Sequence, residues 1–349
     1  MPGTGGREQS VNGERAVLTV TLNAAVDTTL LLPRALAVGA SQTADEVLRL
    51  PGGKGVNVAR VLHTLGLPVR ATGLAGGPAA GIIVDGLAAE GIPADFLPIS
   101  GPSRTNVALV DGRDIGADPR VTEINEPGPT VTAEEGVRFL AHLTRLLPGV
   151  PAMVLCGSLP PGLPDDYYAR LIVCARAAGV PVLLDTSGRA LRPALAAGPL
   201  LIKPNEAETA GLIGRAVQVA GAPALLPALR AMGAGAVALT LGAEGAILNT
   251  GAGTWRGRVA VARAVSPVGS GDAFLAGLLA GLLDAVRDGH SATLAGALVD
   301  GLVVAGALAR AVACGAANTL RHGAGVLDAS EVTRLEGLAE VNQLPRPLS

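Results

Sequence analysis

A lysine among glycines stands just before a helix-like segment in the stretch LPGGKGVNVARVLHTLGL, residues 50–67. Gly52, Gly53 and Gly55 allow the backbone to approach a ligand closely, and apolar residues then recur at helical spacing. The N-terminus of such a helix attracts anions, so this loop is expected to hold a phosphate beside Lys54. A Walker A loop would have Ser or Thr after the lysine, and this chain has glycine. A glycine-rich turn with an exposed lysine is the alternative.

A second glycine loop comes directly before an aspartate and a long apolar segment, in SPVGSGDAFLAGLLAGL. The backbone N–H groups of Gly269, Ser270 and Gly271 at a helix start can surround developing negative charge. Asp272 stands beside them, where its carboxylate can accept a proton. The pattern therefore predicts an anion hole coupled to a general base. An aspartate that only caps a helix is the alternative.

Two shorter motifs offer groups suited to a nucleotide and its metal ion. In KPNEAE, Asn205 and Glu208 are three residues apart, and such oxygen ligands suit Mg²⁺, usually through retained waters. A helix cap by Asn205 with an exposed Glu208 is the alternative. In TLGAEG, Thr240, Gly242 and Gly245 follow a predicted strand and suit close approach by a nucleotide, although a plain hairpin fits the same residues.

The elements that must position these motifs alternate between short buried strands and longer helices. This alternation predicts an α/β fold with a doubly wound, mostly parallel sheet, in which ligands bind at the carboxyl ends of the strands. The predicted strands are 16–22, 69–75, 152–158, 180–186, 200–205 and 236–242, and the predicted helices are 80–90, 133–147, 165–178 and 222–232.

Two segments interrupt this alternation, at residues 28–50 and 95–126. They have strand-like patterns without intervening helices, so we expect them to form a small antiparallel flap, or lid, over the site. The expected organisation is a mobile N-terminal tail over 1–15, one domain over 16–328 that includes the lid, and a C-terminal segment over 329–349.

The composition excludes several kinds of partner. With 27 basic and 29 acidic residues and no basic run, the chain is not expected to bind nucleic acid. The longest apolar stretches fall short of the roughly 20 residues that a membrane span needs, so no membrane partner is expected. The cysteines and histidines show no metal-binding spacing. The N-terminal residues lack an apolar signal, which favours a cytoplasmic protein.

Nine motifs together resemble the PfkB-type carbohydrate kinases of the ribokinase superfamily, and among them most of all 1-phosphofructokinase and tagatose-6-phosphate kinase. The resemblance covers about residues 16–328 and implies a ribokinase-like fold with a small β-rich lid. It also implies an enzyme that uses ATP and Mg²⁺ to phosphorylate a ketohexose phosphate, such as fructose 1-phosphate. In order, the motifs are TLNAAVD, PGGKGVNVAR, SRTNVALVD, TEINEPGP, GSLPPGLP, KPNEAE, TLGAEG, VGSGDAFLAG and GAANTLRHGAG.

The same resemblance implies a role for each motif residue. Lys54 and Arg104 are expected to bind the phosphate that the acceptor already carries, and a homodimer through the lid is also implied. Asp272 becomes the base, Gly269, Ser270 and Gly271 the anion hole, Asp27, Gly52, Gly53 and Asn57 the sugar site, Asn205, Thr240, Gly242 and Gly245 the ATP site, and Asn205 with Glu208 the water-mediated magnesium pair.

The chain departs from the family pattern in three places. Ala25 stands where proline is usual, Ser270 stands where alanine is usual, and residues 112–120 look like an insertion in the lid. Tagatose 6-phosphate, fructose 6-phosphate or an uncharged sugar remain alternative acceptors, although two cations facing a neutral ligand would be unpaired. A non-catalytic sugar-phosphate sensor is the alternative of another class, and it would not need Asp272 as a base.

Overall fold

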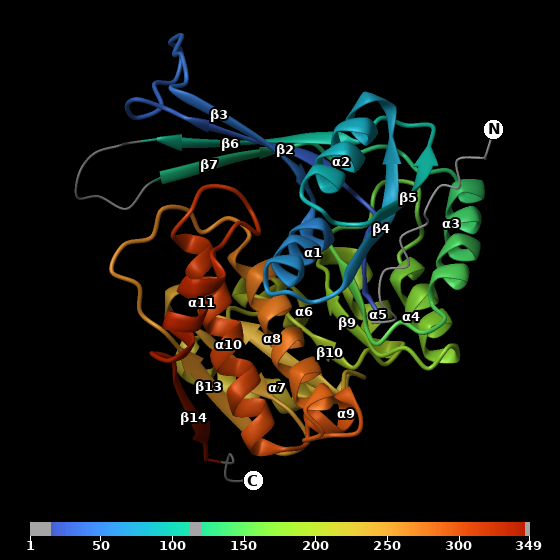
Figure 1. Ribbon diagram of the computed structural model, residues 1–349, viewed down its shortest axis with the longest axis vertical. Helices are drawn as coiled ribbons and strands as arrows, with labels where there is room; N and C mark the ends of the chain where they lie inside the picture. Colours follow the sequence, from blue (N-terminus) through green and yellow to red (C-terminus); the bar gives the residue numbers. More distant parts are fainter. Residues whose placement is uncertain (1–14, 112–119, 346–349) are drawn as a thin grey trace, which may run out of the picture.

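The computed structural model describes residues 15–111 and 120–345, with a ten-stranded sheet at its centre (Figure 1). The strand order is β14-β13-β12-β11-β10-β9-β8-β1-β4-β5. Seven adjacent strands are parallel: β1 (Val17–Thr21), β4 (Val69–Gly76), β5 (Ala94–Ile99), β8 (Met153–Cys156), β9 (Val182–Asp185), β10 (Leu201–Ile202) and β11 (Ala236–Thr240). Each predicted strand segment contains one of them, so the predicted doubly wound α/β fold is confirmed.

Helices cover both faces of this sheet. One face carries α1 (Lys54–Thr64), α2 (Gly77–Ala89), α8 (Ser270–Arg287), α9 (Leu294–Ala297), α10 (Gly301–Thr319) and α11 (Ala329–Glu336). The other face carries α3 (Ala133–Leu146), α4 (Tyr167–Ala177), α5 (Leu191–Ala196), α6 (Glu206–Ile213) and α7 (Ala222–Ala231). The four helices predicted from the sequence are present as α2, α3, α4 and α7.

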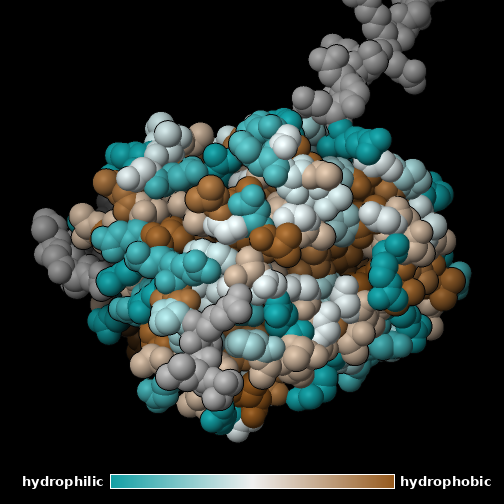
Figure 2. Space-filling view, turned by 90° about the horizontal axis from the view of Figure 1, so that it is seen from below, coloured by the Kyte–Doolittle hydropathy of each residue, from teal (hydrophilic) through white to brown (hydrophobic). Residues whose placement is uncertain are grey.

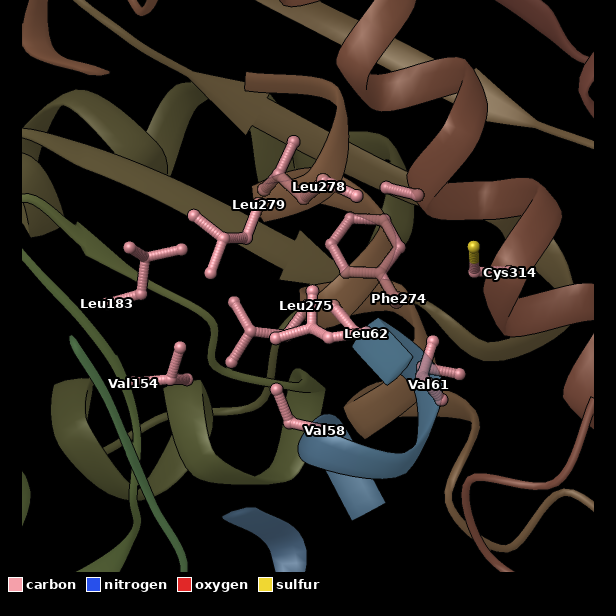
Figure 3. Close-up of a cluster of buried hydrophobic side chains, with 14 of the residues drawn as sticks. Val58, Val61, Leu62, Val154, Leu183, Phe274, Leu275, Leu278, Leu279 and Cys314 are labelled. Carbon is pink, nitrogen blue, oxygen red and sulfur yellow. The ribbon is translucent and has the colours of Figure 1, made fainter. Parts of the chain in front are cut away.

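Alternate residues of each buried strand face the two helical layers. In β8, Val154 and Cys156 belong to the core under α1 and α8, while Met153 and Leu155 belong to the core on the opposite face. Aliphatic side chains fill the first core and fix α1 against α8 (Figure 3). The residues that meet there include Val58, Val61 and Leu62 of α1 and Phe274, Leu275, Leu278 and Leu279 of α8.

A second sheet stands off from the main body at the upper left of Figure 1. It has the order β3-β2-β6-β7, formed by β2 (Ala25–Leu31), β3 (Glu46–Gly52), β6 (Arg104–Asp111) and β7 (Arg120–Asn125). We refer to this four-stranded sheet as the lid.

The lid differs from the prediction in two respects. It is mixed rather than antiparallel, because β2 and β6 run parallel. The start of the segment 95–126 lies outside it, since β5 pairs with β4 in the large sheet. Of the predicted insertion at 112–120, residues 112–119 lie outside the described residues, as do residues 1–14 of the predicted tail.

The C-terminal segment extends the large sheet rather than standing apart from it. Antiparallel strands β12 (Ala246–Asn249) and β13 (Thr254–Arg258) continue the sheet beyond β11, and β14 (Glu340–Leu344) pairs with β13. A boundary after residue 328 therefore separates β14 from the large sheet that it joins, and α11 from the helical layer on one face of that sheet.

Helix α10 is the one described helix long and apolar enough to cross a membrane by length and composition. Half of its most apolar window is buried inside the protein, where it packs along α8. The face seen from below in Figure 2 shows hydrophobic residues in groups between hydrophilic ones. Such scattered apolar exposure is usual on folded domains.

Candidate active site

A cavity of about 1030 Å³ lies between the lid and the carboxyl ends of the central parallel strands. This is the position at which open α/β sheets bind ligands. Gly52 and Glu208 do not line the cavity but adjoin it through Asp27 and Lys54. The predicted site residues in its lining are Asp27, Gly53, Lys54, Asn57, Arg104, Asn205, Thr240, Gly242, Gly245, Gly269, Ser270, Gly271 and Asp272.

The residues of the predicted anion hole lie at the start of α8. Gly269 caps the helix with φ 82°, and a Cβ atom there would lie 2.6 Å from the Cα of Ala324, so glycine is required. The Ser270 N–H already donates to the Pro267 carbonyl at 3.2 Å, and its hydroxyl donates to the same oxygen at 2.7 Å. The N–H groups of Gly271 and Asp272, in the first helical turn, are therefore the better placed donors.

Asp272 lies in this first turn and is 6% exposed. The Asn57 side-chain amide donates a hydrogen bond to its carboxylate at 2.8 Å. Burial raises the pKa of Asp272 to about 7, against the lowering effects of Lys54, Asn57 and Lys203. A carboxylate with a pKa near neutrality is suited to accept a proton and to release it again.

A buried cluster of charges lies beside Asp272 at the ends of β9 and β10. Asp185 is 1% exposed, accepts a hydrogen bond from Lys54 at 3.0 Å and forms an ion pair with Lys203 at 3.1 Å. Burial alone would raise the pKa of Asp185, but Lys203 and Lys54 lower it below its ordinary value. Burial likewise opposes the charge of Lys54, but the negative charges of Asp185, Asp272 and Glu208 raise its pKa.

Sequence reasoning did not identify Asp185 or Lys203 as site residues. Each follows an apolar run, in VPVLLD and LLIK, so a charged residue at the end of a buried strand was the available signal. Lys203 is 3% exposed, and a Cβ atom on Gly271 would lie 3.3 Å from its Nζ. The ammonium group of Lys203 therefore faces the start of α8, next to the proposed anion hole.

Asn205 and Glu208 form a capping box at the start of α6. The Asn205 side chain accepts from the Glu208 N–H at 2.8 Å, and the Glu208 carboxylate accepts from the Asn205 N–H at 2.9 Å. The capping alternative is thus present. That alternative placed Glu208 in solvent, whereas here the side chain is not exposed and its second carboxylate oxygen lies 3.5 Å from the ammonium group of Lys54. Within residues 15–111 and 120–345, no group of three or more His, Cys, Asp or Glu side chains could hold a metal ion.

The TLGAEG motif forms the tight connection between β11 and the antiparallel β12, so the hairpin alternative is correct. Gly242 and Gly245 have φ values of 56° and 83°. A Cβ atom on Gly245 would lie 2.1 Å from the carbonyl oxygen of Gly257. Because Thr240, Gly242 and Gly245 also line the cavity, the hairpin does not conflict with a role in ligand binding.

The lid contributes a polar row that faces the cavity. Asp27 of β2 is in register with Asn106 of β6, whose amide donates to the Asp27 carboxylate at 2.8 Å. Burial raises the pKa of Asp27, although Asn106 and Arg104 oppose it. Gly52 makes room for this carboxylate, since a Cβ atom there would lie 2.2 Å from it.

Arg104 and Lys54 line the same cavity but contact different partners. Arg104 donates to the backbone carbonyls of Asn23 at 3.2 Å and Glu126 at 3.1 Å, both near the lid. Lys54 contacts the carboxylates at the strand ends and α6. The described contacts thus place Lys54 and Arg104 in the lining of one cavity, which Lys203 also lines, and do not show Lys54 and Arg104 meeting at one point.

The chain matches the family model described as pfkB family carbohydrate kinase over residues 20–330. A putative phosphofructokinase from Staphylococcus aureus is 27% identical, with TM-score 0.72 over 94% of this chain and 99% of that chain. A possible 1-phosphofructokinase from Thermotoga maritima is 25% identical, with TM-score 0.79 over 95% and 100%. A ribokinase from Arabidopsis thaliana, complexed with ribose and ATP, is 21% identical, with TM-score 0.68 over 93% and 99%. The last likeness concerns the fold, which is ribokinase-like as predicted.

Proposed function

Since the chain belongs to the PfkB family of carbohydrate kinases, we propose that it phosphorylates the free hydroxymethyl group of a ketohexose phosphate with ATP. The acceptor proposed first is fructose 1-phosphate, with fructose 1,6-bisphosphate and ADP as products. The observation that carries this proposal is Asp272, a buried carboxylate at the start of α8 in the wall of a cavity that the cationic side chains of Lys54, Arg104 and Lys203 also line. A sensor that only binds a sugar phosphate would not need that base.

The chemistry follows from the positions of these groups. Asp272 accepts the hydroxyl proton as the oxygen attacks the γ-phosphorus of ATP, and the bond to the bridging oxygen of ADP breaks. The N–H groups of the first turn of α8 stabilise the charge on the transferred group. Lys203, held by Asp185 beside Gly271, adds a positive charge on the same side.

The acceptor's own phosphate supplies binding energy far from the reacting hydroxyl. We assign this phosphate to Lys54 and Arg104. We assign the sugar hydroxyls to Asp27, Asn57 and the backbone at Gly53. Energy from the phosphate contacts can then align the distant hydroxyl with Asp272. This assignment is supported by the location of all five residues in the lining of one cavity.

We assign the ATP site to the other end of the cavity, at Thr240, Gly242 and Gly245, with Asn205 near the phosphates. The match to the family of pfkB carbohydrate kinases supports ATP as the donor. Mg²⁺ would be held through its waters by Asn205 and Glu208, whose oxygens suit it, and it would neutralise the phosphates. Both residues also make the capping box, which leaves them as indirect rather than direct partners.

The same proposal includes a homodimer formed through the lid. The lid carries apolar side chains that are exposed in the single chain, including Val47 at 45% and Ile124 at 60%. A second lid could cover them.

The experiment is a coupled ADP-release assay with fructose 1-phosphate, fructose 6-phosphate, tagatose 6-phosphate and fructose, each at saturating ATP and Mg²⁺. We expect the highest kcat/KM with fructose 1-phosphate and the lowest with fructose, because only the phosphorylated sugars offer an anion to Lys54 and Arg104. If kcat/KM were highest with tagatose 6-phosphate, the proposed acceptor would be tagatose 6-phosphate instead of fructose 1-phosphate. Tight binding of a sugar phosphate without ADP release would favour the sensor.

A further inference from the structure

Arg60 is a buried arginine, 7% exposed, one turn after Asn57 on α1. A guanidinium has five N–H donors, and all of those in Arg60 have acceptors. Nε and Nη2 donate to the Glu90 carboxylate at 2.6 and 2.9 Å, and Nη2 also donates to the Pro51 carbonyl at 2.8 Å. Nη1 donates to the Ala324 carbonyl at 2.8 Å and to the Asn57 side-chain oxygen at 3.3 Å.

The contact between Arg60 and Asn57 fixes which end of the Asn57 amide faces the base. A guanidinium only donates, so it holds the amide oxygen of Asn57. The amide nitrogen is then directed to the Asp272 carboxylate, to which it donates at 2.8 Å. If the amide turned over, its oxygen would face the carboxylate and the two groups would repel each other.

Two other acceptors of Arg60, Pro51 and Ala324, adjoin the two glycine loops of the site, and the third, Glu90, lies at the end of α2. Pro51 comes directly before Gly52 and Gly53, in the glycine-rich loop that leads to Lys54 and that we call the acceptor loop. Ala324 packs against Gly269, the cap of the anion hole, where the space for a Cβ atom is closed. Glu90, at the end of α2, supplies the compensating charge for Arg60.

We propose that Arg60 is a positioning residue for catalysis, which orients Asn57 toward Asp272 and fixes the acceptor loop against the loop that supports the anion hole. Arg60 does not line the cavity and acts only through its neighbours. This inference rests on the proposed function, because it takes Asp272 to be the base. It predicts that loss of Arg60 acts on Asp272 through Asn57 and not independently.

The expected signature is a change in the pH profile. The Asn57 hydrogen bond stabilises the ionised carboxylate and lowers the pKa of Asp272. Without this hydrogen bond the pKa of Asp272 rises further. The fall of kcat/KM on the acid side of the profile, the acid limb, then moves to higher pH. The other groups that act on the charge of Asp272 are Lys54, Asp185 and Lys203, and also the Cys156 thiol. They lie on α1, at the end of β9, directly after β10 and on β8, and the substitution leaves them in place.

The experiment is a double-mutant cycle of Arg60→Lys and Asn57→Ala, read as pH profiles of kcat/KM. Arg60→Lys should move the acid limb up by about one pH unit and lower kcat about tenfold near neutral pH, with the KM for ATP nearly unchanged. In the Asn57→Ala background the same substitution should move the acid limb no further. Equal shifts in both backgrounds, or no shift in either, would overturn the proposal.

Arg310→Lys is the matched control. Arg310 also joins helices through its guanidinium, with Asp284 of α8 and Glu336 of α11 as partners. Arg310→Lys should lower the melting temperature without moving the acid limb. If Arg60→Lys does not fold, Arg60→Gln takes its place in the same cycle.

An NMR titration of the ¹³C-labelled Asp272 carboxyl, assigned with Asp272→Asn, gives the same answer without turnover. It separates failure of this inference from failure of the proposed kinase activity. The inference fails if Arg60→Lys leaves the titration midpoint unchanged, whether or not the enzyme turns over any acceptor.

Discussion

The two walls of the cavity are built in different ways. In the wall formed by β9, β10 and α8, Asp185, Lys203 and Asp272 are buried, and Asp185 pairs with Lys203 and with the partly exposed Lys54 of α1. In the lid wall, Asp27 and Arg104 are half-buried, and Arg104 contacts backbone carbonyls that belong to the lid side. One wall is rigidly attached to the core, and the other is a small sheet of its own.

This difference matches the different demands of catalysis and acceptor binding. Groups that stabilise a transition state act best when they are already in position, because no reorganisation is then required during the reaction. The wall at β9, β10 and α8 meets this demand, since α8 is fixed against α1 by a packed aliphatic core (Figure 3). Acceptor recognition can instead use groups that rearrange when a ligand enters. We therefore expect substitutions at the start of α8 to affect kcat, and substitutions of the acceptor-binding cations, Lys54 of α1 and Arg104 of the lid, to affect KM.

The largest effect is expected from Asp272→Asn, in the rigid wall. Removal of a positioned general base should lower kcat by roughly a hundredfold to ten-thousandfold, while the fold is retained because asparagine has nearly the same shape. Steady-state kinetics with the best acceptor and a thermal melt give both values. Near-normal turnover by this variant would remove Asp272 from the mechanism.

Lys54→Ala and Arg104→Ala compare the two walls directly. Each should raise the KM for the phosphorylated sugar roughly tenfold to a hundredfold, the usual effect of losing a charged hydrogen bond, with the ATP KM little changed. Only Lys54→Ala should also lower the melting temperature, because it removes one of the two cations paired with the buried Asp185. Unsubstituted fructose, which has no phosphate, is the control substrate. A raised ATP KM with an unchanged sugar KM would show that the loop at Lys54 binds the donor.

The pH profile tests whether burial has set the base near neutrality. Asp272 must be ionised to accept a proton, and burial raises its pKa to about 7. The rate should therefore be nearly constant above that pH and fall about tenfold per unit below it. A profile of kcat/KM between pH 5 and 9 measures this limb. A rate that stays flat down to pH 5 would assign the proton transfer to another group.

Most of the fold could be predicted from the sequence, because buried parallel strands read as apolar runs between helical segments. The antiparallel edge could not be predicted in full. β14 has the pattern EVNQL, in which only two of five residues are partly buried, so little periodicity marks it as a strand. β5 was assigned to the lid because the two-residue alternation of a strand does not specify which sheet it joins.

The candidate site was predictable where a motif is local and less so where it is assembled from distant residues. Glycine loops beside Lys54 and Asp272 are visible within a few residues of sequence. Asp185 and Lys203 become partners only because β9 and β10 are adjacent in the sheet, which places their ends together. Arg60 reaches Glu90 and Ala324 across the fold, and sequence spacing gives no sign of either contact.

The smallest effect is expected at Ser270, and it tests how the rigid wall works. The Ser270 hydroxyl donates to the Pro267 carbonyl, so it is directed to its own loop rather than offered to a ligand. If the hole acts through backbone N–H groups, Ser270→Ala should change kcat/KM only a few-fold, under about 1 kcal/mol.

Gly269→Ala is the matched comparison for Ser270→Ala. Whereas Ser270→Ala only removes a hydroxyl, Gly269→Ala adds a methyl group one residue earlier, at φ 82° and against the Ala324 backbone. Strain of about 1–3 kcal/mol from such a conformation should displace the start of α8 and lower kcat far more than Ser270→Ala does. Both variants should be measured at saturating ATP. If Ser270→Ala caused the larger loss, a hydroxyl rather than the backbone would contact the transferred phosphoryl group, and the distinction between a rigid catalytic wall and an adaptable lid would lose its main support.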